Sequence, residues 1–284
     1  MQSLNISSSA LRGIQLALDN SANNMSNMDT VGYKRRVASF SELLVDSMTE
    51  QPATDRENRN SPVGLRIGSG ARLGMTKLDM GQGSMKQTDV PTDLMIQGEG
   101  YFRLGSQELD ANGARVEEFR FTRNGSFHLE ESAYFGGFVL VGSNGHVLLN
   151  ESDTPIVLPT DEVRELVVSD DGFLTVNGEP TFERVGVWKV HNPDMLKQVG
   201  DNLFSIGENV NIDPGAPLAL EEIYESAWTD NLASVRQGAL EASNVNMQEE
   251  MTQLINIQRA YQLNSRAIGI SDQMMSIATS IRTR

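Results

Sequence analysis

Apolar residues recur every seven positions near both ends of the chain. Near the start, the repeat is formed by Leu4, Leu11, Leu18 and Met25, with Ile14 and Met28 in a second column. Toward the end, a second repeat is formed by Met247, Leu254, Tyr261, Ile268 and Met275. A seven-residue apolar repeat is typical of helices that pack against other helices. The pattern therefore predicts long N- and C-terminal helices that form a coiled-coil-like region.

The C-terminal repeat is wider than the seam of a two-stranded coiled coil. Two more apolar columns flank it, one with Ala260, Ala267, Met274 and Ile281 and one with Leu263, Ile270 and Ile277. Between Ala239 and Ile281 there is no proline and one glycine, Gly269, so a helix of about 40 residues and roughly 60 Å is expected. A helix with three apolar columns needs more than one neighbour.

Amide side chains lie opposite the leucine stripe of the first helix on a helical wheel. They belong to Asn20, Asn23, Asn24 and Asn27. Amides both donate and accept hydrogen bonds, so they pack against another chain at a lower cost than charged side chains do. We interpret this face as part of an assembly interface; a solvated face without charge is the alternative. The predicted interface consists of Leu4, Leu11, Ile14, Leu18, Met25, Asn20, Asn24, Asn27, Met247, Leu254, Tyr261, Ile268 and Met275.

The stretch DTVGYKRR predicts the end of the first helix. Gly32 suits a left-handed cap, and Tyr33 can fold back as its apolar contact. The basic residues Lys34, Arg35 and Arg36 that follow favour the negative end of a helix. A phosphate or lipid site is the alternative interpretation of this basic cluster.

The middle of the chain has a different period. From Leu94 to about Gly207, short apolar runs alternate with polar residues, which is typical of half-buried strands. Hairpin turns are predicted at Asn112-Gly113, Asn124-Gly125, Asn144-Gly145, Asp171-Gly172 and Asn177-Gly178. The expected fold class is α+β, with a central antiparallel β-rich domain. The expected regions are a helical domain from 1–45 and 236–284, an extended connecting segment at 46–90 and a β-rich outer domain at 91–235.

Composition and charge exclude several classes of protein. The 284 residues carry a net charge of −15, yet residues 1–45 sum to +1 and residues 240–284 to zero, so the acidic excess lies in the middle. This charge disfavours nucleic-acid binding and contact with anionic lipid. The chain has no cysteine, no apolar run that would insert in a membrane and no apolar block typical of a cleaved signal peptide.

The residues offer no convincing catalytic or metal-binding constellation. His128, His146 and His191 are the three histidines, and we interpret them as ordinary strand or turn residues. Asp170-Asp171-Gly172 lacks the acidic residue that a calcium loop needs at its twelfth position, so a turn explains it better. We therefore expect no enzyme activity, no cofactor and no metal.

Three blocks together resemble the bacterial flagellar basal-body rod and hook family. They are NSANNMSNMDTVGYKRR near the start, TDLMIQGEGYFRL with FTRNGSFHL in the middle, and GALEASNVNMQEEMTQLINIQRAYQLNSRAIGISDQMM near the end. The blocks lie in family order and span nearly the whole chain. Within the family, QRAYQLNS with Asp272 and Met274 is most similar to the distal rod type; a proximal rod or hook-type subunit is the alternative. Tyr33, Tyr101 and Met95 depart from the usual family residues.

The resemblance implies a structural subunit that is exported unfolded, without a signal peptide, by the flagellar export apparatus. It implies polymerisation with itself and with other rod and hook subunits in the basal body, outside the cytoplasmic membrane, to transmit torque from motor to hook. The terminal helices would form an inner tube and the β domain an outer layer. Because short isolated helices are marginal in water, we expect the ends to be largely disordered in a monomer and to order on assembly.

Two other classes of function remain as alternatives. A secreted carbohydrate-binding β module or a glycosidase would need an exposed aromatic platform or a convergent pair of carboxylates. The chain has only two tryptophans, Trp188 and Trp228, and no acidic pair stands out from its general acidity. A cytosolic coiled-coil scaffold would explain the heptads and leave the paired terminal motifs unexplained.

Overall fold

The structure is a computed structural model that divides into two compact units. It describes residues 2–42, 45–47, 66–68, 71–105, 119–132, 135–158, 163, 165–206, 224–228 and 233–282. One unit, the helical unit, consists of Met1–Ser26, Arg36–Asp79 and Asn246–Arg284; the other, the β body, consists of Asn27–Arg35 and Met80–Val245. The fold is α+β, as the periodicities predicted. The domain boundaries expected from the sequence, 1–45 with 236–284, 46–90 and 91–235, stay predictions.

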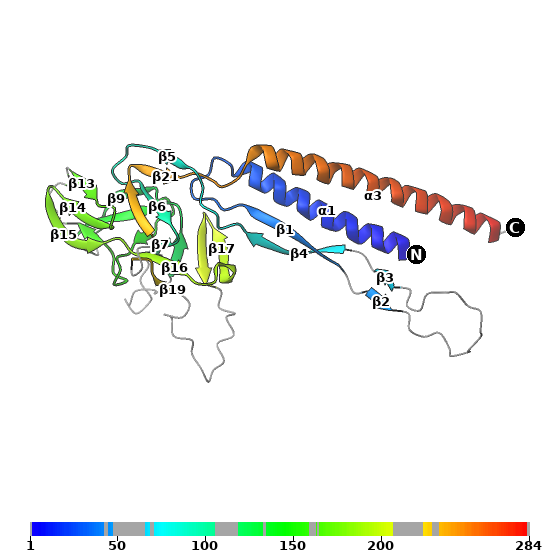
Figure 1. Cartoon of the computed structure of the whole chain (residues 1–284), viewed down its shortest axis with the longest axis horizontal. Helices are drawn as coiled ribbons and strands as arrows, with labels where there is room; N and C mark the ends of the chain where they lie inside the picture. Colours follow the sequence, from blue (N-terminus) through cyan, green and yellow to red (C-terminus); the bar gives the residue numbers. More distant parts are fainter. Residues whose placement is uncertain are drawn as a thin grey trace, which may run out of the picture. The chain divides into compact units, whose positions relative to one another are not determined.

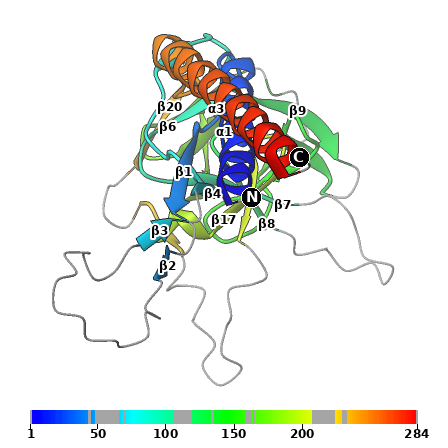
Figure 2. The same cartoon turned by 90° about the vertical axis from the view of Figure 1, so that its right-hand side faces the viewer.

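The helical unit pairs two antiparallel helices with a β ribbon. Helix α1 (Gln2–Ser26) and helix α3 (Met247–Arg282) lie side by side, with both chain ends at the same end of the pair (Figure 1). Strands β1 (Arg36–Glu42) and β4 (Ala71–Leu78) pair antiparallel, and so do β2 (Val45–Ser47) and β3 (Arg66–Gly68). Helix α1 lies between α3 and the β1–β4 ribbon, so it packs on two sides (Figure 2).

Both helices are shorter than the sequence predicted. Helix α1 ends at Ser26, because Asn27 and Thr30 form a local turn in which the Thr30 amide donates to the Asn27 carbonyl at 3.2 Å. Gly32 does have the expected left-handed conformation, with φ at +68°, but it lies six residues beyond the helix end. Helix α3 begins after Asn246, whose side-chain oxygen accepts from the Gln248 amide at 3.0 Å as an N-cap.

The start of the expected C-terminal helix is instead a strand. Residues Ala239–Glu241 form β21, which pairs antiparallel with β5 (Met85–Gln87). A pairing partner more than 150 residues away cannot be inferred from local helix propensity, so tertiary contacts override it here.

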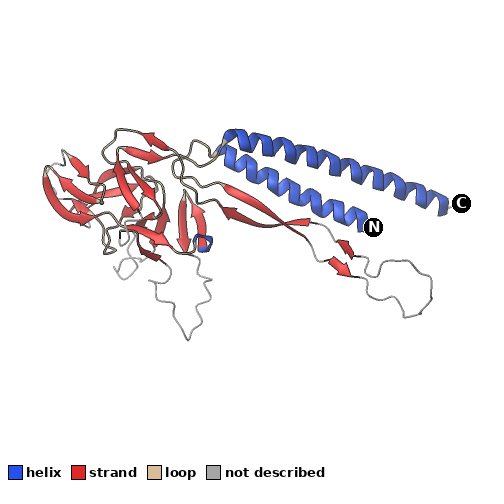
Figure 3. Ribbon diagram, viewed as in Figure 1, coloured by secondary structure: helices blue, strands red, loops and turns tan. Residues whose placement is uncertain are grey.

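The β body contains a ten-stranded sheet among its described residues, together with smaller sheets (Figure 3). The large sheet is built from β7 (Tyr101–Gly105), β8 (Phe119–Thr122), β9 (Phe127–Ser132), β10 (Gly137–Gly142), β11 (Val147–Leu148), β12 (Val157–Leu158), β16 (Val187–Val190), β17 (Leu196–Gly200), β18 (Leu203–Ile206) and β19 (Tyr224–Ser226). A three-stranded sheet is built from β13 (Leu166–Val168), β14 (Phe173–Val176) and β15 (Glu179–Arg184), and β6 (Leu94–Gly98) pairs with β20 (Ala233–Gln237). The described pairings are antiparallel, which confirms the β-rich prediction.

Three predicted hairpin turns are confirmed. They join β10 to β11, β13 to β14 and β14 to β15, at Asn144-Gly145, Asp171-Gly172 and Asn177-Gly178. The glycine of each turn has positive φ, as such tight turns require.

One predicted hairpin is wrong and one was predicted outside the described residues. Asn124-Gly125 connects β8 to β9, but β8 pairs with β7 and β18 whereas β9 pairs with β10. The Gly125 carbonyl accepts from the Leu94 amide at 2.9 Å, so this turn is used to hold a distant segment. Asn112-Gly113 falls among residues that the structure does not describe.

The β body has a closed apolar core. Phe102, Leu140 and Val187 are fully buried, and the ring of Phe102 meets that of Phe127 edge to face with centroids 5.4 Å apart. Burial of each large apolar side chain contributes on the order of 1.5–3 kcal/mol. The β body therefore contains its own source of folding free energy.

Candidate functional site

The most buried stripe of α1 consists of small and polar residues rather than leucines. Gly13, Ala17, Ser21 and Asn24 are buried at spacings of four, four and three residues. Small side chains let a helix approach its neighbours closely. The predicted seam residues Leu11, Ile14, Leu18 and Met25 are half-buried, and Leu4 lies in α1 with its side chain outside the described set.

A buried polar cluster joins the two helices. The Ser21 hydroxyl donates to Glu250 Oε2 at 2.6 Å, and the Asn24 amide donates to Glu250 Oε1 at 3.2 Å. All three side chains are about 1% exposed. A polar contact of this kind fixes the register of a helix pair, because sliding one helix would leave buried polar groups without partners.

The same asparagine also holds the start of β1. The Asn24 amide donates to the Arg36 carbonyl at 2.9 Å and its oxygen accepts from the Arg36 amide at 3.0 Å, in the way that a neighbouring strand would. Asn20 donates to the same carbonyl at 2.8 Å. The hydrogen bonds that the sequence suggested for contact with another chain are therefore made within this chain. A role of Asn20, Asn24 and Asn27 at an assembly interface stays a prediction.

Helix α3 has one covered side and a broad uncovered apolar surface. Half-buried positions follow helical spacing and include Leu254, Ile268 and Met275 of the predicted seam. Eighteen large apolar residues are exposed in the described part of the chain, and half of them lie on α3. These nine are Met247, Met251, Ile255, Tyr261, Leu263, Ile270, Met274, Ile277 and Ile281. They include the whole flanking column Leu263, Ile270 and Ile277, and Met274 and Ile281 of the other flanking column.

Glu241 is the centre of a buried anchor in the β body. Its Oε1 accepts from Lys34 Nζ at 2.7 Å and from the Gly83 amide at 2.8 Å, and its Oε2 accepts from Arg123 Nη1 at 3.1 Å. Its backbone carbonyl accepts from the Gly32 amide at 2.8 Å. The anchor thus ties residues 27–35, which follow α1, to β21, which precedes α3.

The role of Lys34 differs from both interpretations of the basic cluster. Lys34 is 2% exposed and also donates to the Gly81 carbonyl at 2.9 Å, so it is neither at a helix end nor available to a phosphate or lipid. Arg123 is 5% exposed, and Glu241 is 1% exposed. Burying these charges is tolerable because each has a partner of opposite sign and further hydrogen bonds.

Tyr101 completes the anchor. Arg123 stacks over its ring at 5.2 Å from the centroid, and its hydroxyl donates to Met80 Sδ at 3.2 Å. Burial raises the pKa of the Tyr101 phenol; the Arg123 charge lowers this pKa, while Glu241 and Glu99 raise it further. The phenol therefore stays neutral through the physiological pH range.

Sequence reasoning missed Glu241, Glu250, Ser21 and Arg123 as a group. Lys34 and Glu241 are 207 positions apart, so no local pattern connects them. The sequence did carry one signal: each terminal motif contains charged residues beside apolar ones, and charged residues at such positions can be buried in pairs.

The described residues contain no helix suited to crossing a membrane and no group of three metal-ligating side chains.

Comparisons with known proteins agree with the terminal motifs. Residues 4–34 match the flagella basal body rod protein family, and residues 236–281 match the flagellar basal body rod FlgEFG protein C-terminal family. These matches cover most of both helices and include Lys34 and Glu241.

Relatives match over almost the whole chain. The flagellar hook-basal body complex protein FlhP of Bacillus subtilis is 34% identical over 99% of this chain and 100% of its own length. Flagellar basal-body rod proteins FlgG of Borreliella burgdorferi and of Caulobacter vibrioides are each 29% identical, over 99% and 100% of this chain and 99% and 100% of their own. The chain belongs to the flagellar basal-body rod protein family.

Proposed function

We propose that this chain is a structural subunit of the distal flagellar basal-body rod, which polymerises through its terminal helices and transmits torque from motor to hook. Family membership supports the rod, and the similarity to relatives named FlgG supports the distal position. A proximal rod or hook-type subunit is the alternative within the family. None of the relatives named above is described as a carbohydrate-binding protein, and we propose a structural rather than a catalytic role.

The observation that carries this proposal is the exposed apolar surface of α3. Soluble monomers rarely expose contiguous apolar patches of this kind, and such patches mark surfaces that contact other proteins. Nine large apolar residues on a single helix would each contribute on the order of 1.5–3 kcal/mol if a neighbouring subunit buried them. We propose that helices of several subunits bury this surface in coiled-coil-like packing, with the predicted interface residues at the contacts.

The remaining parts of the proposal follow from the family. The subunit reaches the basal body outside the cytoplasmic membrane by signal-peptide-independent export, and its partners are itself, other rod and hook subunits and the export apparatus. The β body forms an outer layer, and terminal helices that are marginal in a free monomer gain order in the assembly.

A charge placed on the exposed column of α3 tests the polymerisation. Leu263 is 65% exposed, so Leu263→Glu leaves the monomer folded but puts a carboxylate where a neighbouring subunit must exclude water. We expect electron microscopy of basal bodies from cells that carry only this variant to show truncated rods. The adjacent exposed residue supplies the control, Gln262→Glu, which we expect to build complete rods. Complete rods with Leu263→Glu would refute assembly through this surface.

The position in the rod needs a separate measurement. Basal bodies from cells that lack this chain should end at the point where its subunits begin. A stub that retains the proximal rod supports the distal position, and loss of the whole rod supports the proximal alternative.

A further inference from the structure

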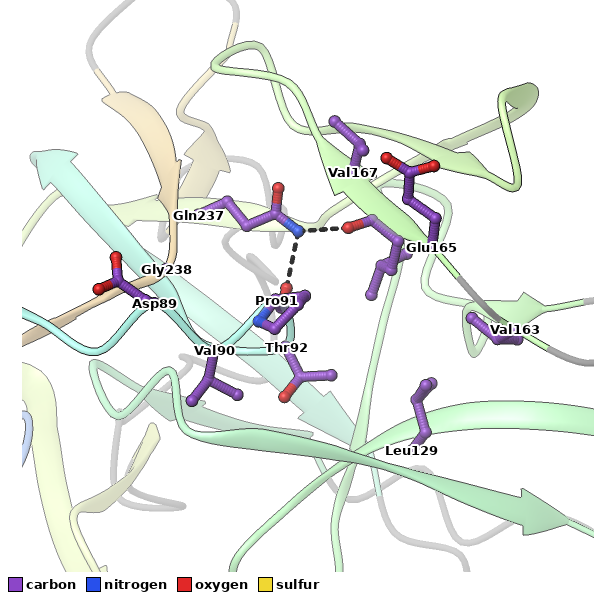
Figure 4. A pocket seen from close by; sticks show the side chains of 11 residues that line it. Asp89, Val90, Pro91, Thr92, Leu129, Val163, Glu165, Val167, Gln237 and Gly238 are labelled. Carbon is purple, nitrogen blue, oxygen red and sulfur yellow. Dashed lines mark hydrogen bonds between the residues drawn. The ribbon is translucent and has the colours of Figure 1, made fainter.

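A cleft of about 510 Å³ opens on the β body (Figure 4). Its volume falls in the range of about 300–1,000 Å³ that is usual for ligand sites. The floor is aliphatic, because Leu129 and Val163 pack on the main core from one side and face the cleft from the other. Val90 and Val167 stand on the rim, 44% and 42% exposed.

Hydrogen bonds hold the walls of the cleft in place. The Gln237 side chain donates to the Leu166 carbonyl at 2.6 Å and to the Pro91 carbonyl at 2.8 Å, and it accepts from the Val168 amide at 3.1 Å. The Asp89 amide donates to the Gly238 carbonyl at 3.0 Å. The cleft is therefore formed before any ligand arrives, so binding does not have to order its walls.

The Gln237 amide also decides how a partner can bind. The Leu166 carbonyl and the Val168 amide, which bond to the Gln237 side chain, point away from β14, toward the open edge of β13. Because one glutamine side chain satisfies both groups, this edge is closed to an added strand. An occupant must bind through its side chains rather than through its backbone.

The charge of the rim selects the kind of side chain. Asp89 and Glu165 line the cleft, and in the described part of the chain neither carboxylate is paired with a lysine or arginine. The Asp89 carboxylate accepts from Gln87 Nε2 at 2.7 Å, and none of the described residues that line the cleft is basic. Lysine and arginine combine an aliphatic stem with a terminal charge, which matches an aliphatic floor below a carboxylate rim. Anionic ligands are disfavoured by the same carboxylates.

We propose that this cleft is a docking site for a basic segment of another protein, which inserts a lysine or arginine side chain next to an aliphatic residue. The carboxylates of Asp89 and Glu165 attract the charge, and Leu129 and Val163 receive the aliphatic groups. The proposal concerns the β body alone and does not depend on polymerisation through the helices.

The test is a titration of the full-length chain with a blocked peptide, Gly-Leu-Lys-Val-Gly. We expect millimolar binding, seen as chemical-shift changes of the Leu129 and Val163 methyl groups in NMR spectra. The same peptide with acetylated lysine should bind at least several-fold more weakly. Added salt should weaken binding of the charged peptide and leave binding of the acetylated peptide unchanged. The double variant Asp89→Asn with Glu165→Gln should lower its affinity about fivefold, as expected for the loss of two surface ion pairs.

Glu130→Gln is the matched control. Glu130 is an exposed carboxylate beside Leu129 in the sequence, but it does not line the cleft, so its removal should leave the affinity unchanged. Equal binding of the charged and acetylated peptides would overturn the proposal. Shifts confined to residues elsewhere, or an equal loss of affinity in Glu130→Gln, would overturn it as well.

Discussion

In the β body, Phe102, Leu140 and Val187 have no exposed surface, whereas on α3 the side chains of Leu263, Ile270 and Ile281 are more than half exposed. The two regions contain similar kinds of apolar residues and treat them differently. The β body buries its apolar residues within the chain, so its folding is complete in one molecule. The helical unit leaves nine large apolar residues of α3 exposed, and under the proposed function contacts with other subunits would bury them.

The two regions also use buried polar groups for different purposes. In the β body, Glu241 ties together segments from both ends of the chain through two buried cations. In the helical unit, the hydrogen bond between Asn24 and Glu250 joins α1 to α3 and fixes their register. Changes at these two sites should therefore affect different parts of the molecule. The two tryptophans, Trp188 and Trp228, both lie in the β body, so fluorescence follows that unit, while the helical signal in circular dichroism follows the other.

The largest effect is expected for Glu241→Ala. This change leaves Lys34 and Arg123 buried without their counter-charge, which typically costs about 3–5 kcal/mol. We expect the free energy of unfolding of the β body, measured by tryptophan fluorescence in denaturant, to fall by that amount. The exposed Glu130→Ala is the control and should change it by less than about 0.5 kcal/mol. Equal effects of the two changes would contradict the role of the anchor.

A smaller and more local effect is expected for Asn24→Ala. It leaves the Arg36 amide and carbonyl and the Glu250 carboxylate short of partners inside the helical unit, at about 2–3 kcal/mol. Hydrogen exchange should show faster exchange of amides in α1 and α3, with amides of the β core unchanged. Gln15→Ala alters an exposed side chain of the same helix and should change exchange little. Faster exchange throughout the β core would show that the two units do not open separately.

The sequence identified the elements whose causes are local. Heptad spacing placed both helices, and alternation with glycine turns placed the hairpins at Gly145, Gly172 and Gly178. The hairpin predicted at Gly125 is wrong because β8 pairs with β7 and with β18, which lies about 80 residues later in the chain, whereas β9 pairs with β10. Local pattern cannot choose between two possible partners of a strand.

The candidate site was only half predictable for the same reason. Residue spacing alone predicted three apolar columns on the C-terminal helix. The structure leaves one of them, Leu263, Ile270 and Ile277, exposed on α3. The Glu241 anchor depends on a buried pair whose members are 207 residues apart, and Lys34 was therefore assigned to the nearest local feature, the helix end. The Asn24 amide was interpreted as a contact to another chain, and the structure shows it hydrogen-bonded to Arg36 and Glu250 of the same chain.

Two glycine substitutions should shift stability in opposite directions in the two regions. At Gly269 in α3 and at Gly178 in the β14–β15 turn, an added Cβ would meet no atom within 4 Å. Gly269→Ala should stabilise the helix by about 1 kcal/mol, because alanine has the higher helix propensity. Gly178→Ala should destabilise the β body by about 1 kcal/mol, because φ is +85° there and a side chain strains this conformation. Helical circular dichroism and tryptophan fluorescence during thermal unfolding measure the two shifts, and a shift of the same sign in both would contradict this assignment.

The smallest effect is expected from the phenol of Tyr101 and only in alkaline solution. Burial raises the pKa of this phenol above its ordinary value of 10.0. Above about pH 10, the unfolded chain then releases the proton while the folded chain keeps it, so ionisation favours unfolding and the free energy of unfolding falls until the pH passes the folded pKa. Below about pH 10 the phenol keeps its proton in both the folded and the unfolded chain, so its contribution to the free energy of unfolding is constant. Tyr101→Phe removes this dependence, so the stability difference between the wild type and the variant should be flat up to about pH 10 and should then move in favour of the variant. Tryptophan fluorescence should report this change because Tyr101 lies in the β body, and a difference that already varies between pH 7 and pH 9 would show that another group is responsible.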